Sequence, residues 1–379
     1  MISVAIVGGK LQGIEACYLS KKAGYKSVLI DKNPNAPASG FCDESAVFDV
    51  RKKEEELIEL LKKADFILPA LEDDEVHEAL LDISRKHGLL LAFDREAYSI
   101  TSSKLKSDEL MRAHRIPAPR YFPECGAPYI IKPSGESGSV GVVKAETEKE
   151  VRSFLDEAAN PESWVIQEYL SGPSYSIEII GVPGMYRTYE ITQIHMADDY
   201  DCKMVTAPCR ISGDVKAGFS ETAKALAGAL GLSGVMDVEV IDDGENLKVL
   251  EIDARLPSQT PIVVYHSMGA NLLSELADIT LYGKFMTKSH EIRRCAAIEH
   301  YLVDEEGAHW TGEHMMVEGG PLKYIEDFFG ADEALTDYDG GRLPWRAAFI
   351  NSAETEEELT EKRRNMLSGI YRHAERTSR

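Results

Sequence analysis

The stretch Val235-Met-Asp-Val-Glu-Val-Ile-Asp-Asp-Gly-Glu-Asn-Leu-Lys-Val-Leu-Glu-Ile-Asp253 predicts a β-hairpin with acidic residues along one face. Asp243-Gly244 is a turn signal between two segments in which apolar side chains alternate with other side chains. If residue 245 is the mirror point, the paired acids are Asp237 with Asp253 and Glu239 with Glu251. The other face is then expected to carry Val238, Val240, Leu250 and Ile252.

Acidic residues that face one another across a hairpin repel each other, so this arrangement needs a compensating cation. Carboxylate oxygens are hard ligands, and they suit a magnesium ion that also holds the phosphates of a substrate. The alternative is an ordinary hairpin whose acidic face is exposed to water.

Length and composition limit the classes of protein that this chain can represent. Its 379 residues are too many for one small core and predict two or three domains. Hydrophobic residues make up 44% and charged residues 28%, which is typical of a soluble globular protein. The net charge of −22 repels phosphate backbones, so we expect no nucleic-acid partner.

Targeting features are also informative. No apolar segment reaches the roughly 18 to 20 residues that cross a bilayer, so no membrane partner is expected. The chain starts a strand at Ile2 without the basic and apolar layout of a signal peptide, which predicts a cytoplasmic enzyme. The cysteines form no CxxC pair, which indicates reduced thiols and makes a zinc site improbable. They are Cys17, Cys42, Cys125, Cys202, Cys209 and Cys295.

The chain divides into three regions. Strand and helix patterns alternate over residues 1–95, which predicts a parallel, doubly wound α/β domain. Over residues 96–288 helices and strands follow one another around a glycine-rich loop, in an α+β pattern. Residues 289–379 contain short predicted strands, two Gly-Gly pairs and a charged terminal helix from Thr355. We expect a small C-terminal α+β domain there.

The first glycine loop, Gly8-Gly-Lys-Leu-Gln-Gly13, opens a helix after a strand, and Asp31 ends the next strand. This layout is close to a dinucleotide fingerprint, although Lys10 occupies the place of the second glycine. A helix N-terminus also attracts other anions, such as a substrate carboxylate. NAD(P) binding, another small-molecule site and purely structural glycines all remain open on this motif.

Two further segments are candidates for nucleotide binding. The loop at 133–141 follows Lys132 and lacks the Walker pattern, but its amides and hydroxyls can face phosphates and it can close over them. The alternative is a solvent-exposed hairpin loop. Gln167-Glu168-Tyr169-Leu170 ends a strand whose edge can hold an adenine, with Glu168 near the exocyclic amine. Alternatively, Glu168 is a solvated strand end.

Arg255 follows the acidic hairpin by two residues and precedes a polar turn bounded by prolines. A guanidinium matches the oxygens of a phosphate or carboxylate. The side chains of Ser258, Gln259 and Thr260 add neutral hydrogen-bonding groups to the same turn. The alternative is that Arg255 simply pairs with the neighbouring acids.

Taken together, these motifs resemble an ATP-grasp carboxylate–amine ligase. The resemblance rests on the order and spacing of Lys104, Lys132 with its loop, the 167–170 segment and the block from Glu239 to Arg255. It implies a three-domain ATP-grasp architecture, with Arg255 as the catalytic residue and two Mg²⁺ held by Glu239, Glu251 and Asp253. The implied ATP-binding residues are Lys104, Lys132, Ser139, Val140, Gln167, Glu168, Tyr169 and Leu170.

Within that family the chain is similar to the ligases of pyrrolysine biosynthesis, nearly end to end and more weakly after about residue 300. The stretches that carry this are 8–13, 18–24, 31–34, 200–202, 204–206, 236–239 and 251–261. The resemblance implies that a carboxylate of 3-methyl-D-ornithine becomes an acylphosphate and is then attacked by the ε-amine of L-lysine. The candidate substrate-binding residues are Leu11, Gln12, Glu72, Asp201, Ser258, Gln259 and Thr260.

Among these candidates, the amides of Leu11 and Gln12 would receive lysine, and Glu72 and Asp201 would hold ammonium groups. The alternative for Glu72 is that it begins an exposed acidic segment. A homodimer is a candidate assembly, which the sequence does not decide. Three other functions stay open at this point. They are another ATP-grasp ligase, such as a purine-biosynthesis synthetase or a different amino-acid ligase, a nicotinamide-dependent oxidoreductase, and a non-catalytic nucleotide sensor.

Overall fold

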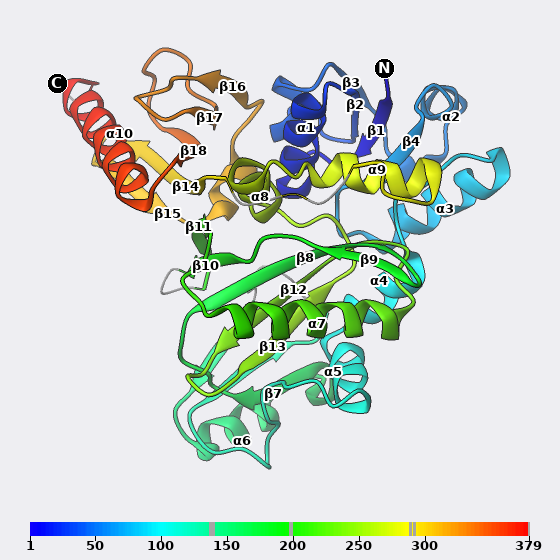
Figure 1. Cartoon of the computed structure of the whole chain (residues 1–379), viewed down its shortest axis with the longest axis vertical. Helices are drawn as coiled ribbons and strands as arrows, with labels where there is room; N and C mark the ends of the chain where they lie inside the picture. Colours follow the sequence, from blue (N-terminus) through cyan, green and yellow to red (C-terminus); the bar gives the residue numbers. More distant parts are fainter. Residues whose placement is uncertain (136–140, 197–199, 288–289, 291–292, 378–379) are drawn as a thin grey trace.

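The N-terminal part of the chain is a parallel α/β unit. The computed structural model describes residues 1–135, 141–196, 200–287, 290 and 293–377 (Figure 1). A parallel sheet in the order β3-β2-β1-β4 is formed by β1 (Ser3–Val7), β2 (Lys26–Asp31), β3 (Glu44–Val47) and β4 (Phe66–Pro69). The helices of this part are α1 (Leu11–Ala23), α2 (Glu55–Leu61), α3 (Asp74–His87) and α4 (Arg95–Thr101). This arrangement confirms the predicted α/β pattern.

Helix ends in this unit are fixed by local chemistry. The side chain of Asp73 accepts a hydrogen bond from the amide of Val76 at 3.1 Å, which caps the start of α3. The same helix stops at Gly88, whose φ of +67° places it in the left-handed region that glycine adopts without strain. Acidic residues in the first turn of α3 and basic residues in the last turn complement the helix dipole.

A small antiparallel sheet follows, with the order β6-β5-β7. Its strands are β5 (Tyr129–Pro133), β6 (Val143–Ala145) and β7 (Trp164–Glu168), and its helices are α5 (Lys104–Ala113) and α6 (Glu148–Glu157). The second glycine loop joins β5 to β6, so most of that motif, 136–140, lies outside the described residues.

The largest sheet has eleven strands in the described part of the chain, with nine in the order β13-β12-β8-β10-β11-β14-β18-β17-β16. Strand β9 pairs with β8, and β15 pairs with β14. The strands are β8 (Ser174–Val182), β9 (Met185–Thr188), β10 (Thr192–Met196), β11 (Cys202–Ala207), β12 (Gly234–Asp242), β13 (Leu247–Asp253), β14 (Cys295–Asp304), β15 (Gly307–Thr311), β16 (Lys323–Glu326), β17 (Glu333–Thr336) and β18 (Trp345–Ala353).

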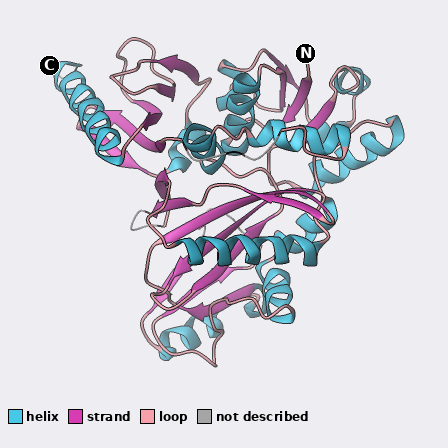
Figure 2. Cartoon of the chain, in the orientation of Figure 1, coloured by secondary structure: helices cyan, strands magenta, loops and turns pink. Residues whose placement is uncertain are grey.

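Helices cover parts of this sheet, as Figure 2 shows for the long helix along its strands. They are α7 (Gly213–Leu230), α8 (Thr260–Met268), α9 (Leu272–Tyr282) and α10 (Glu356–Thr377). Helix α7 contacts β8 and β9, and α10 contacts β14, β15 and β18. Because β11 pairs with β14, the sheet continues across the predicted boundary at 288/289. The three domain ranges therefore stay a prediction.

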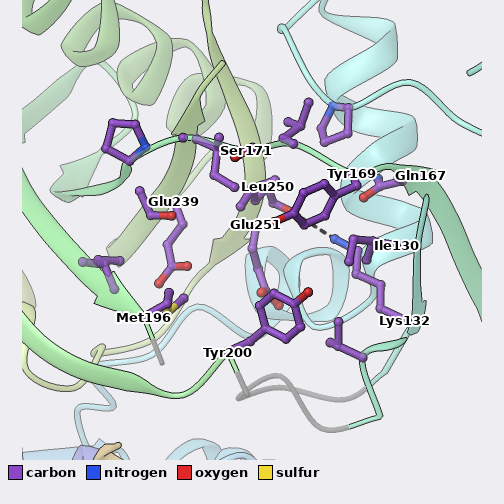
Figure 3. Close-up of a pocket in the computed structure, with 18 of the residues that line it drawn as sticks. Ile130, Lys132, Gln167, Tyr169, Ser171, Met196, Tyr200, Glu239, Leu250 and Glu251 are labelled. Carbon is purple, nitrogen blue, oxygen red and sulfur yellow. Dashed lines mark hydrogen bonds between the residues drawn. The ribbon is translucent and has the colours of Figure 1, made fainter. Parts of the chain in front are cut away.

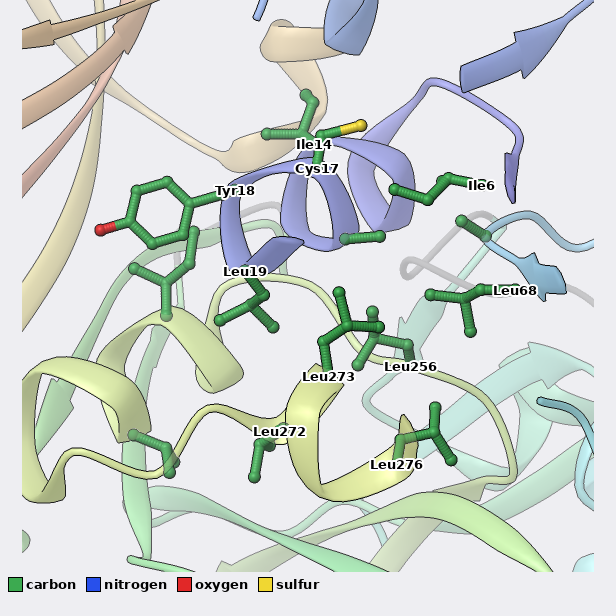
Figure 4. Packing of buried hydrophobic residues seen from close by; sticks show 14 of the residues in the cluster. Ile6, Ile14, Cys17, Tyr18, Leu19, Leu68, Leu256, Leu272, Leu273 and Leu276 are labelled. Carbon is green, nitrogen blue, oxygen red and sulfur yellow. The ribbon is translucent and has the colours of Figure 1, made fainter. Parts of the chain in front are cut away.

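The hydrophobic core joins the N-terminal unit to the rest of the molecule. Helix α1 contacts α9 and α8, and Figure 4 shows Leu19 of α1 lying above Leu272 and Leu273 of α9. All three leucines are fully buried. Burying one such side chain contributes roughly 1.5 to 3 kcal/mol, so the contact holds the two parts in a defined orientation. None of the helices in the described part of the chain combines the length and apolar character that crossing a bilayer requires.

The acidic hairpin forms with the predicted register. Strand β12 pairs with β13 so that Asp237 faces Asp253 and Glu239 faces Glu251. A register shift between Glu239 and Val240 then sets Val240 opposite Val249. The prediction that Leu250 lies on the apolar face with Val240 is therefore wrong, because the irregularity exchanges the facing residues. Val249 is buried in the core, and Leu250 lines a cavity.

Candidate active site

Arg255 lies at the centre of the hairpin acids. Its Nη2 atom is 3.0 Å from Asp253 Oδ2, its Nη1 atom is 3.5 Å from Asp237 Oδ1, and its Nε atom is 3.0 Å from Glu72 Oε1. Arg255 therefore pairs with the neighbouring acids, which was the alternative prediction for this residue. It also brings Glu72, from the loop after β4, to the hairpin.

Two lysines approach the same acids from the side of the small sheet. Lys104 Nζ lies 2.7 Å from Glu251 Oε1. Lys132 is only 8% exposed, and its ammonium group lies 3.5 Å from the carbonyl oxygen of Leu250. Burial lowers the pKa of Lys132, and the charge of Glu251 opposes that shift. An anion bound in the neighbouring cavity would stabilise the charged form of this buried lysine.

A cavity of about 700 Å³ lies between the small sheet and the large sheet. Figure 3 shows Lys132, Glu239 and Glu251 around this cavity, with Tyr169 at its edge. Its walls include most of the predicted ATP-binding residues, namely Lys104, Lys132, Gln167, Glu168, Tyr169 and Leu170. Ser139 and Val140 lie outside the described residues.

Glu168 has its carboxylate engaged by basic side chains. It accepts from Arg120 Nε at 2.9 Å and from Lys248 Nζ at 2.7 Å. Gln167 donates to the hydroxyl of Tyr121 at 3.0 Å. These bonds fix the end of β7 at the wall of the cavity. The predicted contact of Glu168 with an adenine amine stays a prediction.

A second cavity, of about 120 Å³, lies beyond Glu239 and Glu251. Arg255, Asp201 and the whole polar turn Ser258–Gln259–Thr260 line it. Asp201 Oδ1 lies 2.7 Å from His314 Nδ1, which holds the pKa of Asp201 below its usual value despite the opposing effect of burial. The predicted substrate residues of this region therefore line one cavity together with Arg255.

A third cavity, of about 420 Å³, is formed by the first glycine loop, including Leu11 and Gln12. Gln12 Nε2 donates to Glu72 Oε1 at 2.9 Å, so Glu72 joins this loop to Arg255. Helix α1 begins at Leu11, within the glycine loop, so the amides of residues 11 and 12 belong to its first turn. This placement favours an anion at the loop.

The first glycine loop is also closely packed. Gly8 has a φ of +103°, and a Cβ atom there would lie 2.7 Å from the carbonyl oxygen of Ala70. A Cβ atom on Gly13 would lie 2.1 Å from the carbonyl oxygen of Gly8. Asp31 accepts hydrogen bonds from the amides of Gly9 and Asn33 at 2.7 and 2.8 Å. Close packing therefore explains why glycine occupies positions 8 and 13. The carboxylate of Asp31, which would bind the ribose in a dinucleotide site, is instead engaged by backbone amides.

Comparison with known proteins assigns the chain to a family. The protein family described as "ATP-grasp domain" matches residues 101–259 of this chain. The 3-methyl-D-ornithine–L-lysine ligase of Methanosarcina acetivorans is 39% identical over 329 residues, covering 86% of this chain and 87% of that protein. The chain belongs to the ATP-grasp family of ligases. A protein of the same name from Methanosarcina barkeri is 39% identical over 312 residues, covering 81% of each chain.

Solved structures support the ATP-grasp fold as a whole. A biotin carboxylase from Campylobacter jejuni, in a β,γ-ATP complex, has a TM-score of 0.74 at 15% identity and covers 100% of this chain and 96% of its own. An ADP complex of an N5-carboxyaminoimidazole ribonucleotide synthetase has a TM-score of 0.71 at 16% identity, covering 99% and 98%. These likenesses confirm the predicted three-domain ATP-grasp architecture.

The predicted enzyme class is confirmed as well. The chain is an ATP-dependent carboxylate–amine ligase, because family and relatives agree on this class. The sequence also left open a nicotinamide-dependent oxidoreductase and a non-catalytic nucleotide sensor. Family membership decides against both.

The three cavities of this ATP-grasp ligase share residues. Glu251 lines both the first and the second, and His314 lines both the second and the third. Glu72 lines the third and a further cavity of about 520 Å³ that also contains Lys104 and Glu251. The shared walls mean that groups bound in the three cavities would approach one another near Arg255 and Glu251.

The hairpin carboxylates have the chemistry of magnesium ligands. Burial, together with the charges of Glu251 and Asp253, raises the pKa of Glu239 to about 8. Oxygen donors that repel one another in this way fit a divalent cation. As the described residues stand, no group of three or more His, Cys, Asp or Glu side chains is arranged to hold a metal ion. Glu251 is paired with Lys104 and Asp253 with Arg255, so the metal-binding role stays a prediction.

Glu313 and His314 line the second cavity, although the sequence did not predict either residue as part of the site. Both belong to the 3-10 helix η4 (Glu313–Glu318), in the segment where the resemblance weakens. Trp310, on β15, lines the first cavity and was also not predicted. No local motif marks these three residues, and only the continuation of the large sheet beyond β11 brings them to the site.

Proposed function

We propose that this enzyme joins the carboxylate of 3-methyl-D-ornithine to the ε-amine of L-lysine in pyrrolysine biosynthesis. The 39% identity to proteins named for this reaction, over most of both chains, supports the choice of substrates. The observation that carries it is the second cavity, which is lined by six carboxylates and by Arg255. Such a site is complementary to a substrate with one carboxylate and two ammonium groups.

The proposed reaction has two steps. An oxygen of the ornithine carboxylate attacks the γ-phosphorus of ATP, releasing ADP and leaving an acylphosphate. The neutral lysine nitrogen then attacks the acyl carbon, phosphate departs, and the nitrogen gives up one proton as the amide forms. Phosphoryl transfer depends mainly on positioning and charge neutralisation, which Lys104, Lys132 and Arg255 would provide.

The remaining assignments belong to the same proposal. ATP would occupy the first cavity, and Glu239, Glu251 and Asp253 would hold two Mg²⁺, which supply positive charge to the phosphate oxygens when bound. Lysine would bind in the third cavity at Leu11 and Gln12, with Glu72 orienting it. We retain a cytoplasmic location and a homodimer as proposals, the second of which analytical ultracentrifugation tests directly.

The test of the proposed chemistry is transfer of an isotopic label. D-Ornithine with ¹⁸O in its carboxylate is incubated with ATP, Mg²⁺ and L-lysine, and the released phosphate is examined by mass spectrometry. An acylphosphate pathway delivers one labelled oxygen from the carboxylate to each phosphate. Unlabelled phosphate from a reaction that forms the amide would contradict the proposed activation step.

A further inference from the structure

The second cavity contains one carboxylate that the proposed chemistry leaves unused. Among the acids that line it, Asp237 and Asp253 pair with Arg255, Glu251 pairs with Lys104, and Asp201 pairs with His314. Glu239 is assigned to the metal. Glu313, on η4, forms no ion pair within the described part of the chain.

An unpartnered polar atom marks the carboxylate of Glu313. The Oε2 atom of Glu313 is buried without a hydrogen-bond partner among the described residues. Buried polar atoms without partners cost free energy, which a bound ammonium group would recover at a carboxylate.

The turn opposite Glu313 is held rigidly. Glu15, from α1, accepts the amides of Gln259 at 3.0 Å and Ile262 at 2.6 Å. Gln259 has a φ of +66°, which is strained for a residue with a side chain and persists because these bonds over-determine it. Burial raises the pKa of Glu313, and hydrogen bonding from the side chains of Ser258 and Gln259 opposes that rise.

Position within the cavity distinguishes Glu313 from the hairpin acids. Glu251 also lines the nucleotide cavity, whereas Glu313 lines the second cavity alone among the four cavities. A substrate carboxylate activated beside Glu251 would therefore direct the rest of its side chain toward Glu313. The three methylene groups of an ornithine side chain separate its second ammonium group from the reacting end.

We propose that Glu313 binds the side-chain ammonium group of the carboxylate-donating substrate. It thereby selects a diamino acid over an analogue whose side chain carries no charge. This inference rests on the proposed function, since it names how the same site recognises its substrate. It gives the C-terminal segment a role in specificity. A site built to pair with an ammonium group rejects an analogue without one, because the buried carboxylate is then left unpaired.

The test compares D-ornithine with D-norvaline, which has a methyl group in place of the terminal aminomethyl group. The kcat/KM for D-ornithine is divided by the kcat/KM for D-norvaline, both measured with ATP and L-lysine. This ratio is determined for the unmodified enzyme, Glu313→Gln and Glu318→Gln. Glu318 ends the same 3-10 helix and is exposed, which makes it a matched control. We expect Glu313→Gln to lower the ratio about 100-fold, while the KM values for ATP and lysine stay within about twofold.

Each outcome has a defined meaning. An unchanged ratio in Glu313→Gln would overturn the inference, as would an equal fall in Glu318→Gln. Glu313→Asp serves as a second variant if the first folds poorly, and it should lower the ratio less than Glu313→Gln does. Calorimetric titration with the two amino acids gives the same preference without turnover. Absence of amide from the unmodified enzyme, with normal D-ornithine binding, would contradict the proposed function and not this inference.

Discussion

The Nε atom of Arg255 lies 3.0 Å from Oε1 of Glu72, and this bond joins the acidic hairpin to the N-terminal α/β unit. Both side chains are largely buried, at 14% and 24% exposure. Glu72 also accepts a hydrogen bond from Gln12 of the first glycine loop. An ammonium group bound at that loop would compete with Arg255 for the same carboxylate, which couples the two cavities.

Loss of the Glu72 carboxylate should weaken binding of the amine substrate. We expect Glu72→Ala to raise the KM for L-lysine by roughly 10- to 100-fold, since a charge-assisted hydrogen bond is lost, and to change kcat much less. Steady-state ADP release measures both parameters. Glu75→Ala is the control, because Glu75 is 77% exposed and pairs with Arg51 outside the hairpin. A KM for lysine that stays at the original value would remove Glu72 from the amine site.

Glu251 should be indispensable for turnover. It lines the first and second cavities and lies 2.7 Å from Lys104, so its removal disturbs nucleotide and metal binding together. We expect Glu251→Ala to lower kcat by at least ~10³-fold, in the range seen when a preorganised electrostatic group is lost. Glu245→Ala, in the exposed turn of the same hairpin, should retain activity. Normal turnover in Glu251→Ala would break the metal assignment.

A leucine between α1 and α9 should contribute strongly to stability. Leu273 is fully buried in the core that joins the N-terminal unit to the large sheet (Figure 4). Leu273→Ala should lower the free energy of unfolding by about 2 to 5 kcal/mol, because it removes apolar contact and leaves a cavity. Urea unfolding measures the change. Leu90→Ala serves for comparison, since Leu90 is 45% exposed, and it should cost less than about 0.5 kcal/mol.

One buried histidine should make stability depend on pH. His300 is 2% exposed, and burial lowers its pKa to about 4. The unfolded chain binds this proton near pH 6.5, so the stabilisation by neutral His300 is complete above pH 6.5 and is lost as pH falls toward 4. The advantage of the unmodified protein over His300→Asn should therefore be about 2 kcal/mol smaller at pH 5 than at pH 7.

Urea titrations of both proteins at the two pH values give this difference directly. His309→Asn is the control, since the side chain of His309 is 43% exposed on β15. An advantage of unmodified protein over His300→Asn that is equal at pH 5 and pH 7 would show that His300 titrates normally in the folded protein.

The sequence allowed the fold to be predicted where the signals are local. Alternation of side chains around Asp243-Gly244 gave the register of the hairpin correctly up to Glu239. It failed at Leu250, because Val249 and Leu250 are both apolar and alternation cannot show which of them faces the core. In the alternating pattern of residues 1–95, the apolar segment 89–92 forms only a single bridge, from Leu91 to Ile67. Sheet pairing at an edge depends on distant residues that local patterns do not contain.

The residues of the site could also be predicted only where a local motif marks them. Lys132, Glu251 and Arg255 could be predicted because each lies near or just after the end of a strand within a recognisable motif. Glu313 was not found, since it reaches the second cavity only through the pairing of β11 with β14 and has no motif of its own. The bonds of Glu72 with Gln12 and Arg255 join residues 60 and 183 positions apart, which one sequence alone does not reveal.

The most direct test of the central claim is mass spectrometry of a reaction that contains ATP, Mg²⁺, L-lysine and D-ornithine, with each amino acid omitted in turn. The account predicts a product whose mass is the sum of the two amino acids less one water, formed together with ADP and phosphate and absent from both omissions. ADP release without that product would contradict the proposed substrates and would move the search to other carboxylates and amines of the same ligase family.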